Sequence, residues 1–279
     1  PMPSFDTIVI GGGTNGLACA AKLQSSGRKV LVLEARPEAG GAACGSEFAP
    51  GYRSPGLAHL LYLLDPRVEK GMALAQHGFA YAGPALTSTA VSATGDHLVL
   101  DRAYCATIAG SLAAADRDAW SRLRAQLLGF ANILAPFKTI TPPRIAKSAG
   151  NDYLKLAKLG LAARMLGKDQ FRELLRMLLI NVHDVLNDDL TDARLKGLVA
   201  FDTTLGSWLG PRSPTSLILL LNRLAGQAAG EAAAVAYPRG GMGALSAAMG
   251  KAAAACGVTV RTDARAAGLI IENDRVVGV

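Results

Sequence analysis

The sequence FDTIVIGGGTNG at residues 5–16 decides the fold, because a short apolar strand runs directly into a glycine-rich turn. The strand is rich in β-branched side chains, as is typical of a buried parallel strand. Apolar residues such as Leu17 and Ala21 follow at helical spacing. KVLVL at residues 29–33 then supplies a second strand, which ends at Glu34. This order predicts a complete β-α-β unit.

The turn carries glycines in the spacing Gly11-x-Gly13-x-x-Gly16. Gly11 permits the tight turn, Gly13 lets the backbone approach a pyrophosphate, and Gly16 lets the helix pack closely on the strand. The free N–H groups at the start of the helix favour phosphates. Glu34 can accept hydrogen bonds from both ribose hydroxyls, and its charge disfavours the 2′-phosphate of NADP. The glycine spacing also occurs in ordinary turns, but together with strand, helix and acid it predicts a bound dinucleotide.

The segment after Glu34 distinguishes FAD from NAD. It reads EARPEAGGAA over residues 34–43 and places Gly40 and Gly41 shortly after the acid. Here the chain resembles flavoproteins of the phytoene desaturase and amine oxidase superfamily, most closely the phytoene dehydrogenase-like subgroup of pyridine nucleotide-disulphide oxidoreductase domain-containing proteins. In that superfamily the glycine pair approaches the flavin side of the pyrophosphate, and many members follow it with arginine, where this chain has Ala42. The resemblance implies FAD as the cofactor.

Two further segments extend the resemblance. FAPGYRSPG at residues 48–56 resembles the family segment that leads towards the isoalloxazine ring. YPRGGMGAL at residues 237–245 is similar to the GGMG signature of the subgroup, which opens a helix, although an ordinary turn and helix start would read the same way. GVTVRT at residues 257–262 predicts another strand, and the resemblance implies that backbone groups at Ala266 hold the adenine.

The glycine motif and the resemblance together predict the residues that bind the cofactor. They are Gly11, Gly13, Thr14, Asn15, Gly16, Glu34, Ala35, Arg36, Gly40, Gly41, Ala42, Gly56, His59 and Ala266. For His59 a second interpretation stays open, a half-buried structural histidine. No catalytic residue is identified, because the flavin itself carries the redox chemistry. The four cysteines and four histidines show no ligand spacing, so neither a metal site nor a disulfide framework is predicted.

The middle of the chain predicts helices. Only one hairpin is expected there, between residues 90–92 and 97–100. Apolar residues at helical spacing predict one helix from a cap at Asp116 to a point before Pro136. A second amphipathic face is predicted over residues 171–186. By analogy with other flavin folds, such a helical insertion covers the ring and shapes the substrate pocket.

The expected fold class is therefore α/β. A Rossmann-like FAD-binding domain, with a parallel sheet and a β-meander, is formed by residues 1–60 and 236–279. A mainly helical substrate or cap domain is inserted at residues 61–235.

Charge is distributed unevenly along the 279 residues, which carry a formal net charge of +7. Nearly all of the excess lies in residues 138–176, with nine Lys or Arg against three Asp or Glu, mixed with leucines. Two interpretations stay open: a basic amphipathic surface that rests on anionic lipid, or a solvated helix face with snorkelling lysines. Nucleic acid is disfavoured because no binding module accompanies the charge. We expect a cytoplasmic protein, with peripheral membrane contact as the open alternative.

The predicted function is that of an FAD-dependent oxidoreductase, dehydrogenase-like or desaturase-like, which transfers a hydride from an apolar small molecule to the flavin, with a polyene as one candidate substrate. The resemblance alone implies this substrate class. Two alternatives stay open: a flavin amine oxidase-like enzyme, and a dinucleotide-binding fragment without turnover. VVGV at residues 276–279 reads as the middle of a strand after a turn at Asn273 and Asp274. We therefore expect a fragment that stops before the enzyme is complete and is poorly active alone.

Overall fold

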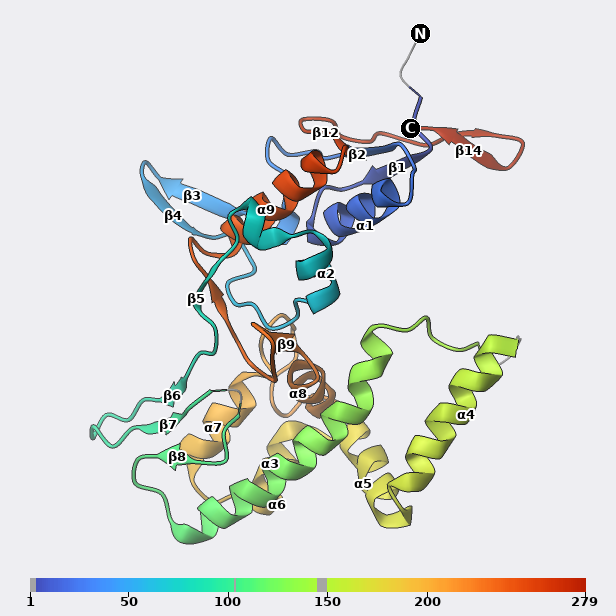
Figure 1. Cartoon of the computed structure of the whole chain (residues 1–279). Helices are drawn as coiled ribbons and strands as arrows, with labels where there is room; N and C mark the ends of the chain where they lie inside the picture. The colour runs from blue at the N-terminus through green and yellow to red at the C-terminus, as the bar shows by residue number, and fades with distance from the viewer. Residues whose placement is uncertain (1–3, 103, 145–149) are drawn as a thin grey trace. The chain divides into compact units, whose positions relative to one another are not determined.

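The computed structural model describes residues 4–102, 104–144 and 150–279, which form two compact units (Figure 1). Unit 1 contains the chain up to Pro84, Ala228–Gly230 and Val235–Val279. Unit 2 contains Ala85–Gln227 and Glu231–Ala234. The chain crosses from one unit to the other after Pro84, Gln227, Gly230 and Ala234. The short strands β9 (Gln227–Ala228) and β10 (Glu231–Ala232) lie at two of these crossings.

Unit 1 is built on a three-stranded parallel sheet in the order β1-β2-β12. The strands are β1 (Thr7–Ile10), β2 (Val30–Leu33) and β12 (Thr259–Arg261). Helices α1 (Thr14–Ser25) and α9 (Met242–Ala255) pack against each other on the same side of the sheet (Figure 1). The predicted β-α-β unit, the helix after the GGMG motif and the later strand are all confirmed.

The other elements of unit 1 are short. They are η1 (Gly41–Ala43), β3 (Gly45–Ala49), β4 (Tyr52–Pro55), α2 (Pro66–Gly71), η2 (Leu74–His77), β5 (Tyr81–Gly83), β11 (Tyr237–Pro238), β13 (Ile270–Glu272) and β14 (Arg275–Gly278). Three antiparallel pairs form: β3 with β4, β5 with β11, and β13 with β14. Asn273 and Asp274 both have positive φ, at 48° and 58°, which confirms the predicted turn between β13 and β14.

The boundaries of the units differ from the predicted segments 1–60, 61–235 and 236–279. Residues 61–84 belong to unit 1 because Leu61, Leu74 and Phe79 are buried in the same hydrophobic cluster as Val32. The sheet-forming unit therefore extends further along the chain than its strand signals indicate.

Unit 2 is mainly helical, as predicted. Its helices are α3 (Ala114–Leu134), η3 (Ala135–Lys138), α4 (Gly150–Met165), α5 (Lys168–Leu179), α6 (Val182–Asp189), α7 (Ala193–Phe201) and α8 (Leu217–Leu224). A small antiparallel sheet runs in the order β6-β7-β8, formed by β6 (Ser88–Ala90), β7 (Leu98–Leu100) and β8 (Ile108–Ala109). The pairing of β6 with β7 confirms the predicted hairpin, and β8 adds a strand that the sequence did not reveal.

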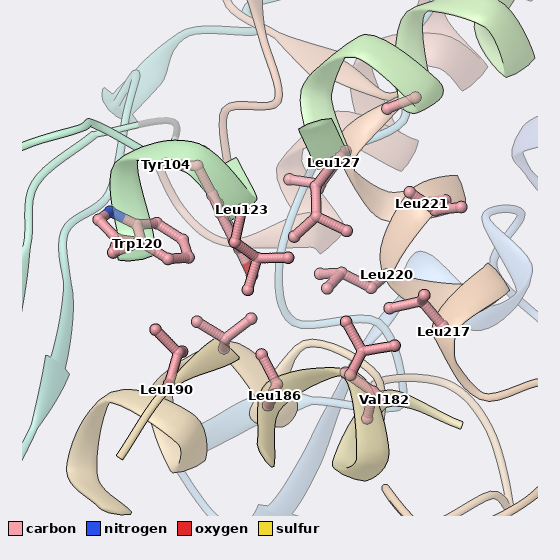
Figure 2. Packing of buried hydrophobic residues seen from close by; sticks show 14 of the residues in the cluster. Tyr104, Trp120, Leu123, Leu127, Val182, Leu186, Leu190, Leu217, Leu220 and Leu221 are labelled. Carbon is pink, nitrogen blue, oxygen red and sulfur yellow. The ribbon is translucent and has the colours of Figure 1, made fainter. Parts of the chain in front are cut away.

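Large apolar side chains from three helices meet in the core of unit 2. Figure 2 shows Trp120 and Leu123 of α3 pointing towards Leu186 of α6 and Leu220 of α8. All four are at most 2% exposed. This core fixes the helices against one another.

Three polar side chains, those of Tyr104, Asp202 and Arg223, form a cluster inside unit 2. The hydroxyl of Tyr104 donates to Asp202 Oδ2 at 2.9 Å, and Arg223 Nη1 donates to the carbonyl of Ala233 at 2.7 Å. Arg223 Nε lies 3.4 Å from Asp202 Oδ2. Burial raises the pKa of Asp202, and the positive charge of Arg223 offsets part of that rise. The opposite charges of Asp202 and Arg223 thus compensate each other within the core, next to the hydroxyl of Tyr104.

Two local predictions in this unit are wrong. Asp116 does not cap α3, which begins at Ala114 with Ala113 as its N-cap residue. Its carboxylate instead accepts hydrogen bonds from Thr191 and Asp192, just before α7. The predicted face over residues 171–186 is divided between α5 and α6, because Asn181 starts a new helix by accepting from the N–H of Asp184 at 2.9 Å.

Part of the basic stretch at 138–176, residues 145–149, lies outside the described residues. Nowhere in the described ranges does a helix combine the length and apolar content needed to cross a membrane.

Candidate functional site

The glycine-rich turn joins β1 to α1 under tight steric limits. Gly11 has φ of 98°, which side chains rarely tolerate. A Cβ on Gly16 would lie 2.1 Å from the carbonyl oxygen of Gly11, so glycine keeps the helix close to the strand. Gly13, the N-cap residue of α1, offers no side chain to the first-turn N–H groups. Those groups can therefore bind an anion at the start of the helix.

The second glycine pair returns to the same turn. Gly40 donates its N–H to the carbonyl of Gly12 at 2.7 Å, and Gly13 and Gly40 form a parallel bridge. A Cβ on Gly41 would lie only 3.0 Å from Gly13 Cα, and Gly41 also has φ of 58°. The structure therefore brings the two glycine motifs into direct backbone contact, with no side chain between them.

Two residues that were not predicted from the sequence, Cys44 and Ser246, pack against Gly40. A Cβ on Gly40 would lie 2.5 Å from Cys44 Sγ and 2.6 Å from the side chain of Ser246. Ser246 belongs to α9 and donates its hydroxyl to the carbonyl of Gly243 at 3.0 Å. Nothing in the sequence pairs Cys44 with Ser246, because they meet only through the packing of α9.

Glu34 is held at the end of β2 with its carboxylate directed at the glycine turn. Its Oε2 accepts the N–H of Gly12 at 2.8 Å, and its Oε1 accepts the N–H of Arg36 at 2.9 Å. An ionised carboxylate has about four acceptor positions, so two hydrogen bonds leave room for ribose hydroxyls. Gly12 was not among the predicted residues, and a Cβ there would crowd the Glu34 carboxylate at 3.2 Å from Oε2.

The segment predicted to hold adenine lies beside this acid. Ala264 donates its N–H to the carbonyl of Glu34 at 2.9 Å, and Asp263 donates to that of Arg36 at 3.1 Å. Ala35 and Arg36 are exposed, and Ala266 is partly exposed two residues beyond the last of these hydrogen bonds. An adenosine on Glu34 would therefore have accessible backbone beside it.

A mostly apolar cavity of about 380 Å³ opens beside the first turn of α1. Thr14, Asn15 and Ala42 line it on the side of the glycine motifs, and Ala58, Leu60 and Met249 contribute apolar walls. This volume is in the range of small-molecule sites. The sequence predicted Thr14, Asn15 and Ala42, whereas the apolar walls gave no recognisable signal.

A second cavity in unit 1, of about 660 Å³, adjoins the GGMG motif. It is lined by Gly241 and Gly243 together with Arg53, Lys251 and Glu38. The sequence did not single out any of these charged residues as a site. Because the lining carries both positive and negative charges, it does not favour one type of ligand.

The remaining predicted residues lie on the surface. Gly56 and His59 are both exposed, so the half-buried structural interpretation of His59 is wrong. A Cβ on Gly56 would lie 2.8 Å from the carbonyl oxygen of Cys44, which explains the glycine by packing. Among the described residues, no group of three or more His, Cys, Asp or Glu is placed to hold a metal ion.

Comparisons of sequence agree with this geometry. Residues 9–73 match the family described as an NAD(P)-binding Rossmann-like domain. The chain is 30% identical to pyridine nucleotide-disulfide oxidoreductase domain-containing protein 2 of Rattus norvegicus, over 99% of this chain and 50% of that protein. It is 36% identical to one of the limonene dehydrogenase subunits of Castellaniella defragrans, over 34% of this chain and 17% of that protein. The chain thus spans about half the length of the rat relative.

Solved structures share the fold. Putrescine oxidase bound to putrescine has a TM-score of 0.54 at 16% identity, covering 94% of this chain and 51% of that one. An oxidoreductase from Methanosarcina mazei has a TM-score of 0.51 at 16% identity, covering 98% of this chain and 56% of that one. At such identities the likeness shows the architecture alone. It confirms the predicted α/β class with a helical insertion.

Proposed function

Because the chain carries a Rossmann-like dinucleotide-binding domain and is homologous to pyridine nucleotide-disulfide oxidoreductase domain-containing protein 2 along nearly its whole length, we propose that it binds FAD as part of an oxidoreductase. One observation carries the choice of FAD. The Gly40 and Gly41 pair lies against Gly13 at the phosphate turn, which a simple NAD-binding β-α-β unit does not require.

The residues present fit this cofactor. The uncapped first turn of α1 receives the pyrophosphate, and Gly41 keeps side chains away from it. Glu34 accepts the ribose hydroxyls with its remaining acceptor positions, and the backbone near Ala266 borders the adenine. When bound, the flavin supplies the electron acceptor of the reaction, taking up a hydride or its equivalent.

The apolar cavity next to Thr14 supports an apolar substrate. Of its described lining residues only Asp65 is acidic, and that carboxylate already binds the N–H and guanidinium of Arg67. An alkylammonium substrate would need a free anion there, so the lining favours a hydrocarbon over an amine. The partial match to the limonene dehydrogenase of Castellaniella defragrans supports the same class. The apolar walls would pack against such a substrate, and a polyene is one substrate of this kind.

The identity of the cofactor is tested on purified protein. We expect a flavin absorption band that dithionite bleaches, and FAD in the supernatant after acid release. Nicotinamide dinucleotide without flavin would refute the assignment. The absorption and chromatography together separate a flavoprotein from an NAD-binding protein.

The role of Glu34 is tested by titrating apo-protein with FAD. Glu34→Ala should weaken binding by about 1.5–3 kcal/mol for each ribose hydrogen bond lost, and Glu34→Gln by less, because it keeps one acceptor. Glu272→Ala, which removes an exposed acid from β13, is the matched control and should bind FAD normally. Equal affinity of Glu34→Ala and the control would show that the ribose lies elsewhere.

A further inference from the structure

Helix α4 presents an apolar stripe to solvent, formed by Leu154, Leu161 and Met165, which we call the α4 stripe. These side chains are 63%, 58% and 80% exposed. They lie on one face because they are spaced by seven and four residues, about two turns and one turn of an α-helix. Ala157, also exposed, continues the same face. A helix that is merely solvated would place charged residues there instead.

Basic side chains border the stripe on both sides. At about 100° per residue, Lys158 lies roughly 60° to one side of Leu161 and Arg164 roughly 60° to the other. Both are exposed. Asp152, the only acid in α4, is half-buried and lies 3.9 Å from Lys155 Nζ. Among the described side chains of α4, the outward face therefore combines apolar and cationic groups without an anion.

Helix α5 repeats this pairing on its own outer face. Leu175 and Leu179 are 46% and 72% exposed, and Lys168 and Arg172 fall on the same face at spacings of three, four and seven residues. The opposite face packs into the core through buried residues such as Met177. Two successive helices thus place leucines and cations together on their exposed surfaces.

We propose that the α4 stripe rests on the surface of a bilayer that contains anionic lipid. Leu154, Leu161 and Met165 enter the boundary between headgroups and acyl chains, while Lys158 and Arg164 contact lipid phosphates and carboxylates. Charge complementarity selects this occupant. A second copy docking through the same face would bring its own Lys158 and Arg164 against these cations. The proposal does not depend on the flavin, so the two can fail separately.

Vesicle co-sedimentation of the whole chain tests the proposal. We expect binding to vesicles of phosphatidylcholine mixed with phosphatidylserine, weak binding to phosphatidylcholine alone, and release at high salt. A Leu161→Trp variant should show a blue-shifted emission on binding, because the ring leaves water. Equal pelleting with both vesicle types, no pelleting, or an unshifted emission would overturn the proposal.

Charge and apolar variants locate the contact. Lys158→Glu with Arg164→Glu should weaken binding to anionic vesicles by at least about tenfold, since each cation near such a surface contributes attraction. Arg28→Glu with Lys70→Glu makes the same charge change on exposed residues of unit 1 and is the matched control. A matching loss in this control would assign binding to net charge and refute the α4 stripe.

The apolar variant separates lipid from self-association. Leu154→Ser, Leu161→Ser and Met165→Ser combined should abolish vesicle binding and leave the circular dichroism unchanged, because the side chains are exposed. In sedimentation velocity without lipid, the wild type and this variant should have the same oligomeric state. If they convert an oligomer into a monomer, the stripe binds a second copy and the proposal is wrong.

Discussion

The structures of unit 1 and unit 2 depend on opposite kinds of residue. In unit 1 the decisive positions lack side chains: Gly11, Gly16 and Gly41 allow backbone segments to approach where any Cβ would be strained or blocked. In unit 2 the decisive positions carry the largest side chains, such as Trp120, which no water reaches. Unit 1 is therefore sensitive to added atoms, and unit 2 is sensitive to removed atoms.

This difference separates binding from folding. The glycine contacts of unit 1 shape the surface that would face the proposed dinucleotide, whereas the packed helices of unit 2 provide stability through burial. Adding a methyl group should therefore do most harm in unit 1, and deleting atoms should do most harm in unit 2. Three substitutions test this contrast, and a fourth tests a buried hydrogen-bonded carboxylate of unit 2.

The largest effect is expected from Trp120→Ala. Trp120 is 0% exposed, and its Nε1 donates to the carbonyl of Cys105 at 3.2 Å. Removing the ring leaves a cavity and takes this hydrogen bond away from the Cys105 carbonyl, so the free energy of unfolding of unit 2 should fall by about 3–5 kcal/mol. Urea denaturation followed by circular dichroism measures this loss. A decrease of less than about 1 kcal/mol would contradict the inference that unit 2 is sensitive to removed atoms.

Gly16→Ala should produce the largest effect expected in unit 1, on both stability and binding. The new Cβ would lie 2.1 Å from the carbonyl oxygen of Gly11, so α1 must move away from β1. We expect a loss of stability of about 1–3 kcal/mol, as for overpacked sites, and at least about tenfold weaker dinucleotide binding. Calorimetric titration with FAD and urea denaturation measure the two effects. Wild-type values for both would show that the turn adapts.

Asp116→Asn should lower the free energy of unfolding of unit 2 by about 1.5–3 kcal/mol, because hydrogen bonds to a charged group are the stronger kind. The carboxylate accepts the N–H of Thr191 at 2.7 Å and that of Asp192 at 3.1 Å. The substituted amide keeps one acceptor oxygen, so the lower end of this range applies if the side chain reorients. Urea denaturation at neutral pH measures the loss.

The same residue predicts a pH dependence. Burial raises the pKa of Asp116, but the hydrogen bonds from Thr191 and Asp192 outweigh it and hold the pKa below the usual 3.8. The stabilisation is therefore present above about pH 4 and is lost as the pH falls through the lowered value. The difference in stability between wild type and Asp116→Asn should shrink over that acidic range. A constant difference would assign the effect to packing.

Gly129→Ala should produce the smallest effect and the opposite sign to Gly16→Ala. Gly129 lies inside α3, and a Cβ there meets nothing within 4 Å. Alanine favours a helix over glycine by about 0.5–1 kcal/mol, so unit 2 should become more stable by that amount. Thermal unfolding measures the gain. Destabilisation would mean that the helix interior is more crowded than the structure shows.

The sequence predicted the features that local patterns determine. The glycine spacing and Glu34 predicted the β-α-β unit, and helical periodicity predicted α3. It did not predict what depends on partners distant in the chain. Asp116 was assigned to its own helix because the partner segment before α7 is visible only in three dimensions. Cys44 and Ser246 were missed beneath Gly40 for the same reason.

Unlike Gly11, Gly16 and Gly41, Gly13 has a backbone conformation and surroundings that tolerate a side chain. Its dihedral angles, φ −68° and ψ 173°, suit any residue, and a methyl group there would lie 3.8 Å from Gly41 Cα, an ordinary contact. The protein alone therefore has room for alanine at this position, whereas the pyrophosphate of the proposed cofactor would collide with it. If the proposed cofactor binds here, Gly13→Ala should therefore give a protein that keeps the native backbone but does not bind the dinucleotide, and this variant would serve as the reference for calorimetry and spectroscopy.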